Sequence, residues 1–146
     1  MRLQRLLPLA SLALLLANPA IAAPPIYASQ WGTGGGGPGQ FSFPYHCATN
    51  ALGDVYVADS QNNRMQRFDK NGVFLGQWGS NGTGDGQFRN PTGVVCDAAG
   101  DVYVVDQSNH RIQKFTGAGG FILKWGSIGT GNGQFRFPYG VGIDAA

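Results

Sequence analysis

The sequence repeats one pattern three times, with a period of 47 residues. Each copy opens on Trp-Gly and then carries Gly-Gln-Phe and a proline at fixed offsets. Residues 31–77 and 78–124 are identical at 21 of 47 positions, and residues 125–146 match 78–99 at 16 of 22. A period of this length is typical of solenoids, propellers and other repeat arrays, so residues that recur in every copy are first of all candidates for scaffold roles.

Within one repeat the pattern predicts four short strands and no helix. Apolar or alternating segments are separated by turns rich in Gly, Asp and Asn, and Gly recurs too often for helical spacing. The segment from Val102 to Val105 is apolar on both faces, so both faces must be covered. Stacking against identical neighbours achieves this, which predicts an all-β fold built from four-stranded β-propeller blades. In the second repeat the predicted strands are 93–97, 102–105, 111–115 and 121–125.

The repeat resembles the NHL repeat family. Residues 109–115, Asn-His-Arg-Ile-Gln-Lys-Phe, contain the run that names the family, with Ile in place of Leu. Residues 62–68 are the equivalent, with Asn63 in place of His, and a Gly-Asp-Val-Tyr-Val-x-Asp segment precedes both runs. The resemblance covers the chain from about residue 27 onward and implies a β-propeller, typically of six blades in this family.

The repeat register divides the chain into a leader, residues 1–22, and a propeller segment, residues 23–146. At the two ends of the segment we expect an isolated fourth strand near 27–31 and an isolated first strand over 140–144. Because the last residues fall inside a turn of the repeat, we expect the chain to be a fragment of a propeller with further repeats. The repeats present are 31–77, 78–124 and the partial 125–146, about two and a half of six expected blades.

The first 22 residues have the features of a secretory signal peptide. Arg2 and Arg5 precede an apolar run, and Ala20-Ile21-Ala22 offers the small residues at which a signal peptidase cuts. The run is too short to span a bilayer and no later segment is apolar enough, so no membrane span is predicted. We therefore expect the mature chain to be exported to the periplasm or the extracellular space.

The overall charge does not favour nucleic acid as a partner. The chain has 10 Lys and Arg residues against 8 acidic residues, all of them Asp. Without Arg2 and Arg5 the positive and negative charges balance, whereas nucleic-acid binding usually requires a basic stripe or patch.

The two cysteines leave two interpretations open. An oxidising compartment permits a disulfide between Cys47 and Cys96. Such a bridge requires Cα atoms within about 7 Å, and neighbouring blades rarely bring their inner strands that close. In the alternative interpretation both cysteines are small, buried apolar residues of first strands.

Strand direction places the longest loops on one rim of each blade. The Gly-rich loop 79–86 and the polar loop 106–110 open on this rim, which we call the loop-bearing rim. Tight turns at 97–101 and 116–120 form the opposite rim, which we call the turn rim. Function in propellers is usually sought on a loop-bearing rim or in the axial channel.

Two recurring motifs have competing interpretations. The loops of the form Asp-x-x-Asn-x-Arg, residues 59–64 and 106–111, suggest cation sites, but they lack the bidentate Glu of a Ca²⁺ loop, which favours structural hydrogen bonds instead. Cations that recur on the third strands suggest a basic stripe, but nearby Asp residues favour an ion-paired surface. These cations are Arg64, Arg67, Arg111 and Lys114.

Positions that break the repeat are better candidates for a ligand site than positions that keep it. A histidine stands where the other repeats have Gly, at the start of a first strand. A tyrosine flanks this place in two repeats where the second has Thr, and an arginine precedes the proline in two repeats where the first has Ser. Together these residues predict an aromatic and basic collar around the axial opening. The collar residues are Tyr45, His46, Arg89, Arg136 and Tyr139.

These features predict an exported, non-catalytic binding or scaffold module whose loop-bearing rim takes a protein, peptide or glycan. No catalytic residue, metal site or cofactor is assigned. The family resemblance also suggests an enzyme, since NHL-like propellers include lyases whose metal is held by histidines near the axis. This chain has only His46 and His110, which are out of register with each other, so it cannot build a three-histidine zinc site alone.

RNA binding is a third function that the resemblance implies, because NHL propellers attached to tripartite-motif proteins bind RNA. The sequence has no RING-type spacing of Cys and His, and export would separate the chain from most RNA. A salt-dependent affinity for RNA would favour this alternative.

Overall fold

The computed structural model describes residues 30–144. The predicted leader over residues 1–22 lies outside this part of the chain, as does most of the strand expected near 27–31, and Gln30 and Trp31 form no strand. Two four-stranded antiparallel sheets dominate the described residues, which confirms the predicted all-β fold. Within residues 30–144, no helix has the length and apolar character needed to cross a membrane.

The first sheet, which we call blade 1, follows the chain in the order β3-β4-β5-β6, and each strand pairs antiparallel with the next. A two-stranded parallel pair, β1 and β2, lies in the Gly-rich loop ahead of it. The strands are β1 (Thr33–Gly34), β2 (Gln40–Phe41), β3 (Pro44–Thr49), β4 (Val55–Asp59), β5 (Arg64–Phe68) and β6 (Phe74–Trp78).

The second sheet, blade 2, repeats the same order as β7-β8-β9-β10. The predicted third and fourth strands have the observed bounds, while the first strand begins at Pro91 rather than Gly93 and the second extends to Asp106. The elements are β7 (Pro91–Cys96), β8 (Val102–Asp106), the short 3₁₀ helix η1 (Gln107–Asn109), β9 (Arg111–Phe115) and β10 (Phe121–Trp125).

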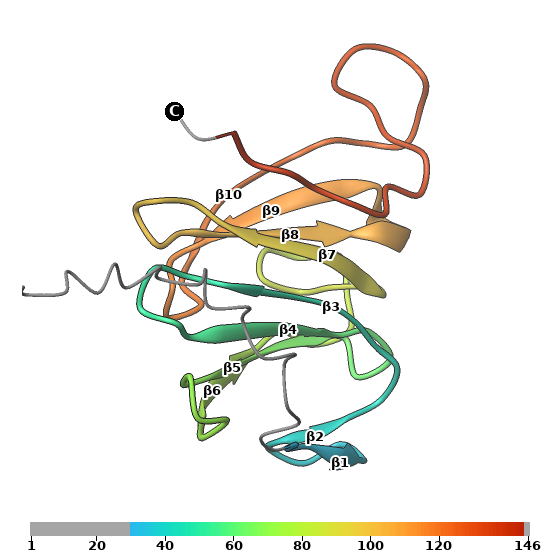
Figure 1. The fold of residues 1–146 in the computed structure, drawn as a ribbon. Helices are drawn as coiled ribbons and strands as arrows, with labels where there is room; N and C mark the ends of the chain where they lie inside the picture. The colour runs from blue at the N-terminus through green and yellow to red at the C-terminus, as the bar shows by residue number, and fades with distance from the viewer. Residues whose placement is uncertain (1–29, 145–146) are drawn as a thin grey trace, which may run out of the picture.

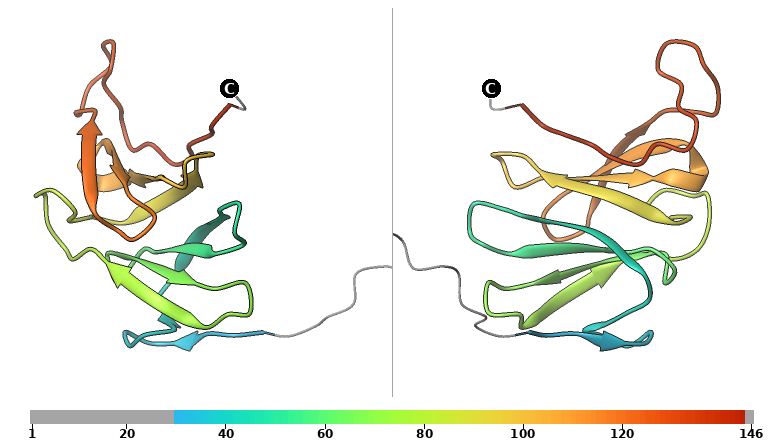
Figure 2. Two further views of the ribbon diagram at one scale, coloured as in Figure 1. Left: turned by 90° about the vertical axis from the view of Figure 1, so that its left-hand side faces the viewer. Right: turned by 45° about the vertical axis from the view of Figure 1, so that its right-hand side comes forward.

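The two blades stack on each other, with the first strands β3 and β7 side by side (Figures 1 and 2). Their facing sides form the main hydrophobic core, which we call the inter-blade core. Val104 and Val105 point to opposite faces of β8 and both are fully buried, which confirms that this strand is covered on both sides. The inter-blade core consists of Tyr56, Ala58 and Met65 from blade 1, Val94, Val102, Val104 and Phe115 from blade 2, and Phe88 from the preceding loop.

Hydrogen bonds across the interface fix how the blades are placed. The Tyr56 hydroxyl donates to the carbonyl of Gly117 at 3.1 Å, and the Ser60 hydroxyl donates to the carbonyl of Pro91. The bond to Gly117 lies on the turn rim and the bond to Pro91 on the loop-bearing rim, so hydrogen bonds join the blades at both ends of the interface. The core and these bonds together join the two repeats into one packed unit.

The strand expected over 140–144 is not formed, and this prediction is wrong. The segment runs beside β7 as an irregular chain (Figure 1), where the Thr92 hydroxyl donates to the carbonyl of Tyr139 at 3.0 Å. In both blades the first strand pairs through backbone hydrogen bonds with the second strand of its own sheet, as β7 does with β8. Within residues 30–144 the third repeat has no counterpart of β8, so the segment has no ladder partner.

Candidate functional site

The loop-bearing rim is held by a buried ion pair beneath each Gly-rich loop. In blade 2, Arg111 Nε donates to Asp106 Oδ2 at 2.7 Å, and both side chains are buried. The two terminal nitrogens of Arg111 donate to the carbonyls of Thr83, Gly84 and Gln87, each at 2.8 Å. A single guanidinium therefore joins the loop to the sheet with four of its five N–H donors.

Blade 1 repeats this arrangement. Arg64 Nε donates to Asp59 Oδ2 at 2.8 Å, and its terminal nitrogens donate to the carbonyls of Gly36, Gly37 and Gln40. The recurring Asp-x-x-Asn-x-Arg loops are thus structural, which confirms the favoured interpretation. Within residues 30–144, no group of three or more His, Cys, Asp or Glu residues is arranged to hold a metal.

The third-strand cations do not form a basic stripe. Arg67 pairs with Asp54 at 2.5 Å, and Lys114 pairs with Asp101 at 2.8 Å, both toward the turn rim. The hydrogen bond that Lys114 donates to Asp101 raises the pKa of Lys114, which keeps the amine charged. The ion-paired interpretation of these residues is therefore confirmed.

His110 belongs to the scaffold. Its Nδ1 accepts a hydrogen bond from the backbone N–H of Phe137 at 3.1 Å, and the two rings meet edge to face at 4.6 Å between centroids. One repeat earlier, Asn63 Oδ1 accepts from the backbone N–H of Asn90 at 3.1 Å. The side chain at this loop position therefore fastens the following repeat in both cases.

The structure brings two of the five collar residues into contact. The rings of Tyr45 and Tyr139 lie 5.8 Å apart between centroids, at an interplanar angle of 53°. They come from β3 and from the segment after Pro138, which lie on either side of β7. Gly93 makes this approach possible, since a Cβ there would stand 2.8 Å from the carbonyl oxygen of Tyr139.

The other three collar residues are also exposed, but within residues 30–144 no side-chain hydrogen bond or ion pair joins them to the tyrosine pair. His46 follows Tyr45 on β3. The backbone of Arg89 is fixed, because its N–H donates to Asp106 Oδ1 at 2.8 Å and its carbonyl accepts from Ser108. Within residues 30–144, the side chains of Arg89 and Arg136 have no salt bridge.

Sequence reasoning missed two further aromatic residues on this rim. Phe43 and Phe137 are 71% and 58% exposed, each just before the proline that precedes a collar tyrosine. The signal was present in the sequence, because Phe-Pro-Tyr occurs at 43–45 and again at 137–139 whereas the second repeat has Asn-Pro-Thr.

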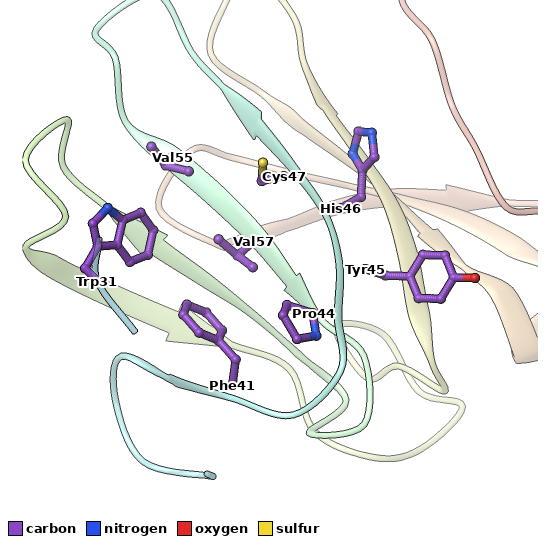
Figure 3. Close-up of a pocket in the computed structure, with 8 residues that line it drawn as sticks. All are labelled: Trp31, Phe41, Pro44, Tyr45, His46, Cys47, Val55 and Val57. Atoms are coloured by element: carbon purple, nitrogen blue, oxygen red, sulfur yellow. The ribbon is translucent and has the colours of Figure 1, made fainter. Parts of the chain in front are cut away.

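A pocket of about 380 Å³ opens on the face of blade 1 that points away from blade 2 (Figure 3). Figure 3 shows Trp31, Phe41 and Val57 on one side of β3 and Tyr45 pointing away from them. The residues on this face correspond, one repeat earlier, to residues of the inter-blade core: Phe41 corresponds to Phe88, and Val57 to Val104. The pocket is therefore an open blade face, and it meets the collar at Tyr45 and His46.

Both cysteines are free thiols, so the disulfide interpretation is wrong. The alternative holds only for Cys96, which is half-buried and packs against the inter-blade core. Burial, with a smaller contribution from the charge of Asp97, raises the pKa of the Cys96 thiol to about 11. Cys47 is exposed, because it occupies on the open face of blade 1 the place that buried Val94 occupies in blade 2.

Comparison with known protein families and proteins identifies the repeat. A family model for the NHL repeat matches residues 88–115. B-box type zinc finger protein ncl-1 of Caenorhabditis elegans is 47% identical over 49 residues, which are 34% of this chain and 6% of that protein. Protein brain tumor of Drosophila melanogaster is also 47% identical over 49 residues, 34% of this chain and 5% of its own length.

Solved structures agree on the fold. Selenomethionine-substituted virginiamycin B lyase from Staphylococcus aureus matches 70% of this chain and 32% of its own, with a TM-score of 0.50 and 17% identity. The chain thus spans only a small part of the proteins it matches, and at this identity the structural likeness concerns the fold alone. The matched residues 88–115 contain β7, β8 and β9. Residues 88–115 thus match the NHL repeat, and the described residues fold as two four-stranded antiparallel sheets that correspond to blades of a β-propeller.

Proposed function

We propose that this chain is an exported binding module whose loop-bearing rim takes a protein, peptide or glycan at the collar. The observation that carries the proposal is the contact between Tyr45 and Tyr139, two exposed rings that come from different repeats. Arg89 and Arg136 are exposed as well, and within residues 30–144 neither forms a salt bridge. Tyrosine and arginine are the side chains that most often dominate binding at protein surfaces. The tyrosine pair is therefore the centre of the recognition surface that we propose.

The scaffold beneath the collar suits recognition because it is rigid. The buried pairs of Arg64 with Asp59 and of Arg111 with Asp106 hold the Gly-rich loops in one arrangement. A preorganised surface loses little conformational entropy when it binds, so more of the contact energy appears as affinity. Side chains that differ between repeats can then set specificity without disturbing the blades.

Binding at the collar predicts a specific pattern in a display experiment. The purified chain is applied to a random peptide library and to a glycan array, beside the double variant Tyr45→Thr, Tyr139→Thr. Both substitutions introduce threonine, the residue type that the second repeat has at the equivalent position, Thr92. We expect the wild-type signals to fall at least tenfold in the double variant, since each lost aromatic contact costs about 1–2 kcal/mol.

A matched control lies on the turn rim, where Leu52 is 79% exposed. The variant Leu52→Ser is expected to keep the wild-type signals. Signals lost equally in both variants, or kept in both, would contradict binding at the collar.

Export predicts a processed N-terminus. When the full chain is produced in a bacterial host with a working secretion system, we expect the chain recovered from outside the cytoplasm to begin at Ala23, after the Ala20-Ile21-Ala22 site. Amino-terminal sequencing or intact mass measures this directly. Replacement of Ala20 and Ala22 by Leu should leave the leader attached, and recovery of wild-type chain with Met1 in the cytoplasm alone would refute export.

A further inference from the structure

Two phenylalanines beside the collar occupy a backbone conformation that suits asparagine better. Phe43 and Phe137 have φ values of 48° and 47°, and Asn90, at the same place in the second repeat, has a φ of 51°. A bulky side chain in this left-handed region is strained, whereas asparagine tolerates it. The turn itself therefore does not require phenylalanine. The ring of Phe137 packs edge to face against His110, whereas within residues 30–144 the ring of Phe43 has no aromatic partner that would explain it.

Phe43 and Phe137 each lie two residues before a collar tyrosine, and we call these four exposed residues together the aromatic platform. All four are more than half exposed: Phe43 71%, Tyr45 58%, Phe137 58% and Tyr139 56%. Exposed aromatic rings held by strained backbone mark surfaces that meet a partner. The second repeat, with Asn90 and Thr92 at these places, leaves a gap in the platform.

The charge beside the platform is positive and unpaired. Within residues 30–144, Arg89 and Arg136 are the arginines without a salt bridge, since the others pair with Asp. The carboxylates on this rim are not free to neutralise them. Asp59 and Asp106 are fully buried, and Asp85 pairs with Lys124. The rim therefore offers two guanidinium groups to a carboxylate ligand.

From this we infer, resting on the proposed function, that the collar and platform bind an acidic polypeptide segment that carries apolar or aromatic side chains. The set of Tyr, Phe and Arg, without Lys, Asp or Glu, has the composition of the centre of a protein–protein interface. Each guanidinium donates two parallel hydrogen bonds to a carboxylate, and the rings pack against the apolar side chains of the segment. Two free arginines are too few for a phosphate backbone, which disfavours nucleic acid.

The inference is tested with the full chain and a random copolymer of glutamate and tyrosine as the probe. We expect saturable binding that weakens at least tenfold when the salt concentration rises from about 0.05 to 0.5 M, because the ion pairs are exposed and screened. Arg89→Ser and Arg136→Ser introduce serine, the residue type that the first repeat has at the equivalent position, Ser42. Each variant should weaken binding about tenfold. A copolymer of lysine and tyrosine should not bind.

The variant Phe43→Asn separates binding from folding. Because asparagine suits the left-handed backbone, the melting temperature should stay equal or rise, while affinity for the probe falls at least about fivefold. A variant that keeps wild-type affinity would overturn the role of the platform. Leu52→Ser on the turn rim serves as the control and should change neither quantity.

Other probes distinguish the failure of this inference from the failure of the proposed function. The chain could bind polygalacturonate, a single-stranded oligonucleotide or a neutral peptide but not the glutamate–tyrosine copolymer. If the double variant Tyr45→Thr, Tyr139→Thr then loses that binding, the acidic polypeptide is overturned as the ligand, and the collar remains a binding site. Absence of any ligand signal that depends on Tyr45 and Tyr139 overturns both.

Discussion

Replacement of Asp106 by Asn is expected to lower the free energy of unfolding by about 3–5 kcal/mol. The carboxylate is fully buried and accepts hydrogen bonds from Arg111 Nε at 2.7 Å, from the amides of Asn109 and Gln113, and from the backbone N–H of Arg89. Its loss leaves the buried guanidinium of Arg111 without a counter-charge. Such a loss is a large fraction of the stability of a domain of this size.

The measurement is urea unfolding followed by tryptophan fluorescence. Asp85→Asn is the matched control, since it removes the same charge from the exposed pair with Lys124, and we expect it to cost at most about 1 kcal/mol. The equivalent variant in blade 1, Asp59→Asn, should behave like Asp106→Asn because it removes the partner of Arg64. Equal and small losses for Asp106→Asn and Asp85→Asn would mean that the buried pair does not hold the rim.

The strands were predictable because two independent signals agree on them. Alternation marks residues 111–115 as a strand, and the repeat places the same strand at Arg64–Phe68, so an error in one copy would conflict with the other. The wrong prediction at 140–144 has a physical reason: the sequence pattern marks the residues of a first strand, but a first strand forms only when it pairs with a second strand, and residues 30–144 contain no such partner for this segment. Cys47 is exposed for a similar reason, since within residues 30–144 no second blade covers the face on which it lies.

The collar was partly predictable for a different reason. Comparison between repeats singled out Tyr45 and Tyr139, and the structure places them in contact. The same comparison also contained Phe43 and Phe137, but their meaning depends on a positive φ that three residues share and that no single sequence reveals. The amino-acid sequence does not distinguish an exposed phenylalanine from a buried one. Backbone conformation was therefore the missing information.

Phe88→Ala is expected to lower the free energy of unfolding by about 3–5 kcal/mol, since it opens a cavity in the inter-blade core. Phe88 is fully buried and its ring lies 5.5 Å from that of Phe115. Phe41→Ala makes the identical change one repeat earlier, on the open face of blade 1, where the ring is only half-buried against Trp31 and Phe68.

Because the Phe41 ring buries less apolar surface than the Phe88 ring, Phe41→Ala should lower the free energy of unfolding by only about 1–2 kcal/mol. Urea unfolding of the two variants side by side measures the difference, and the identical chemistry of the change cancels most effects on the unfolded chain. A clearly larger loss for Phe88→Ala shows that stability resides in the contact between blades rather than in each sheet. Equal losses would show instead that the face around Phe41 is covered in solution, and the open pocket of blade 1 would then be a closed interface.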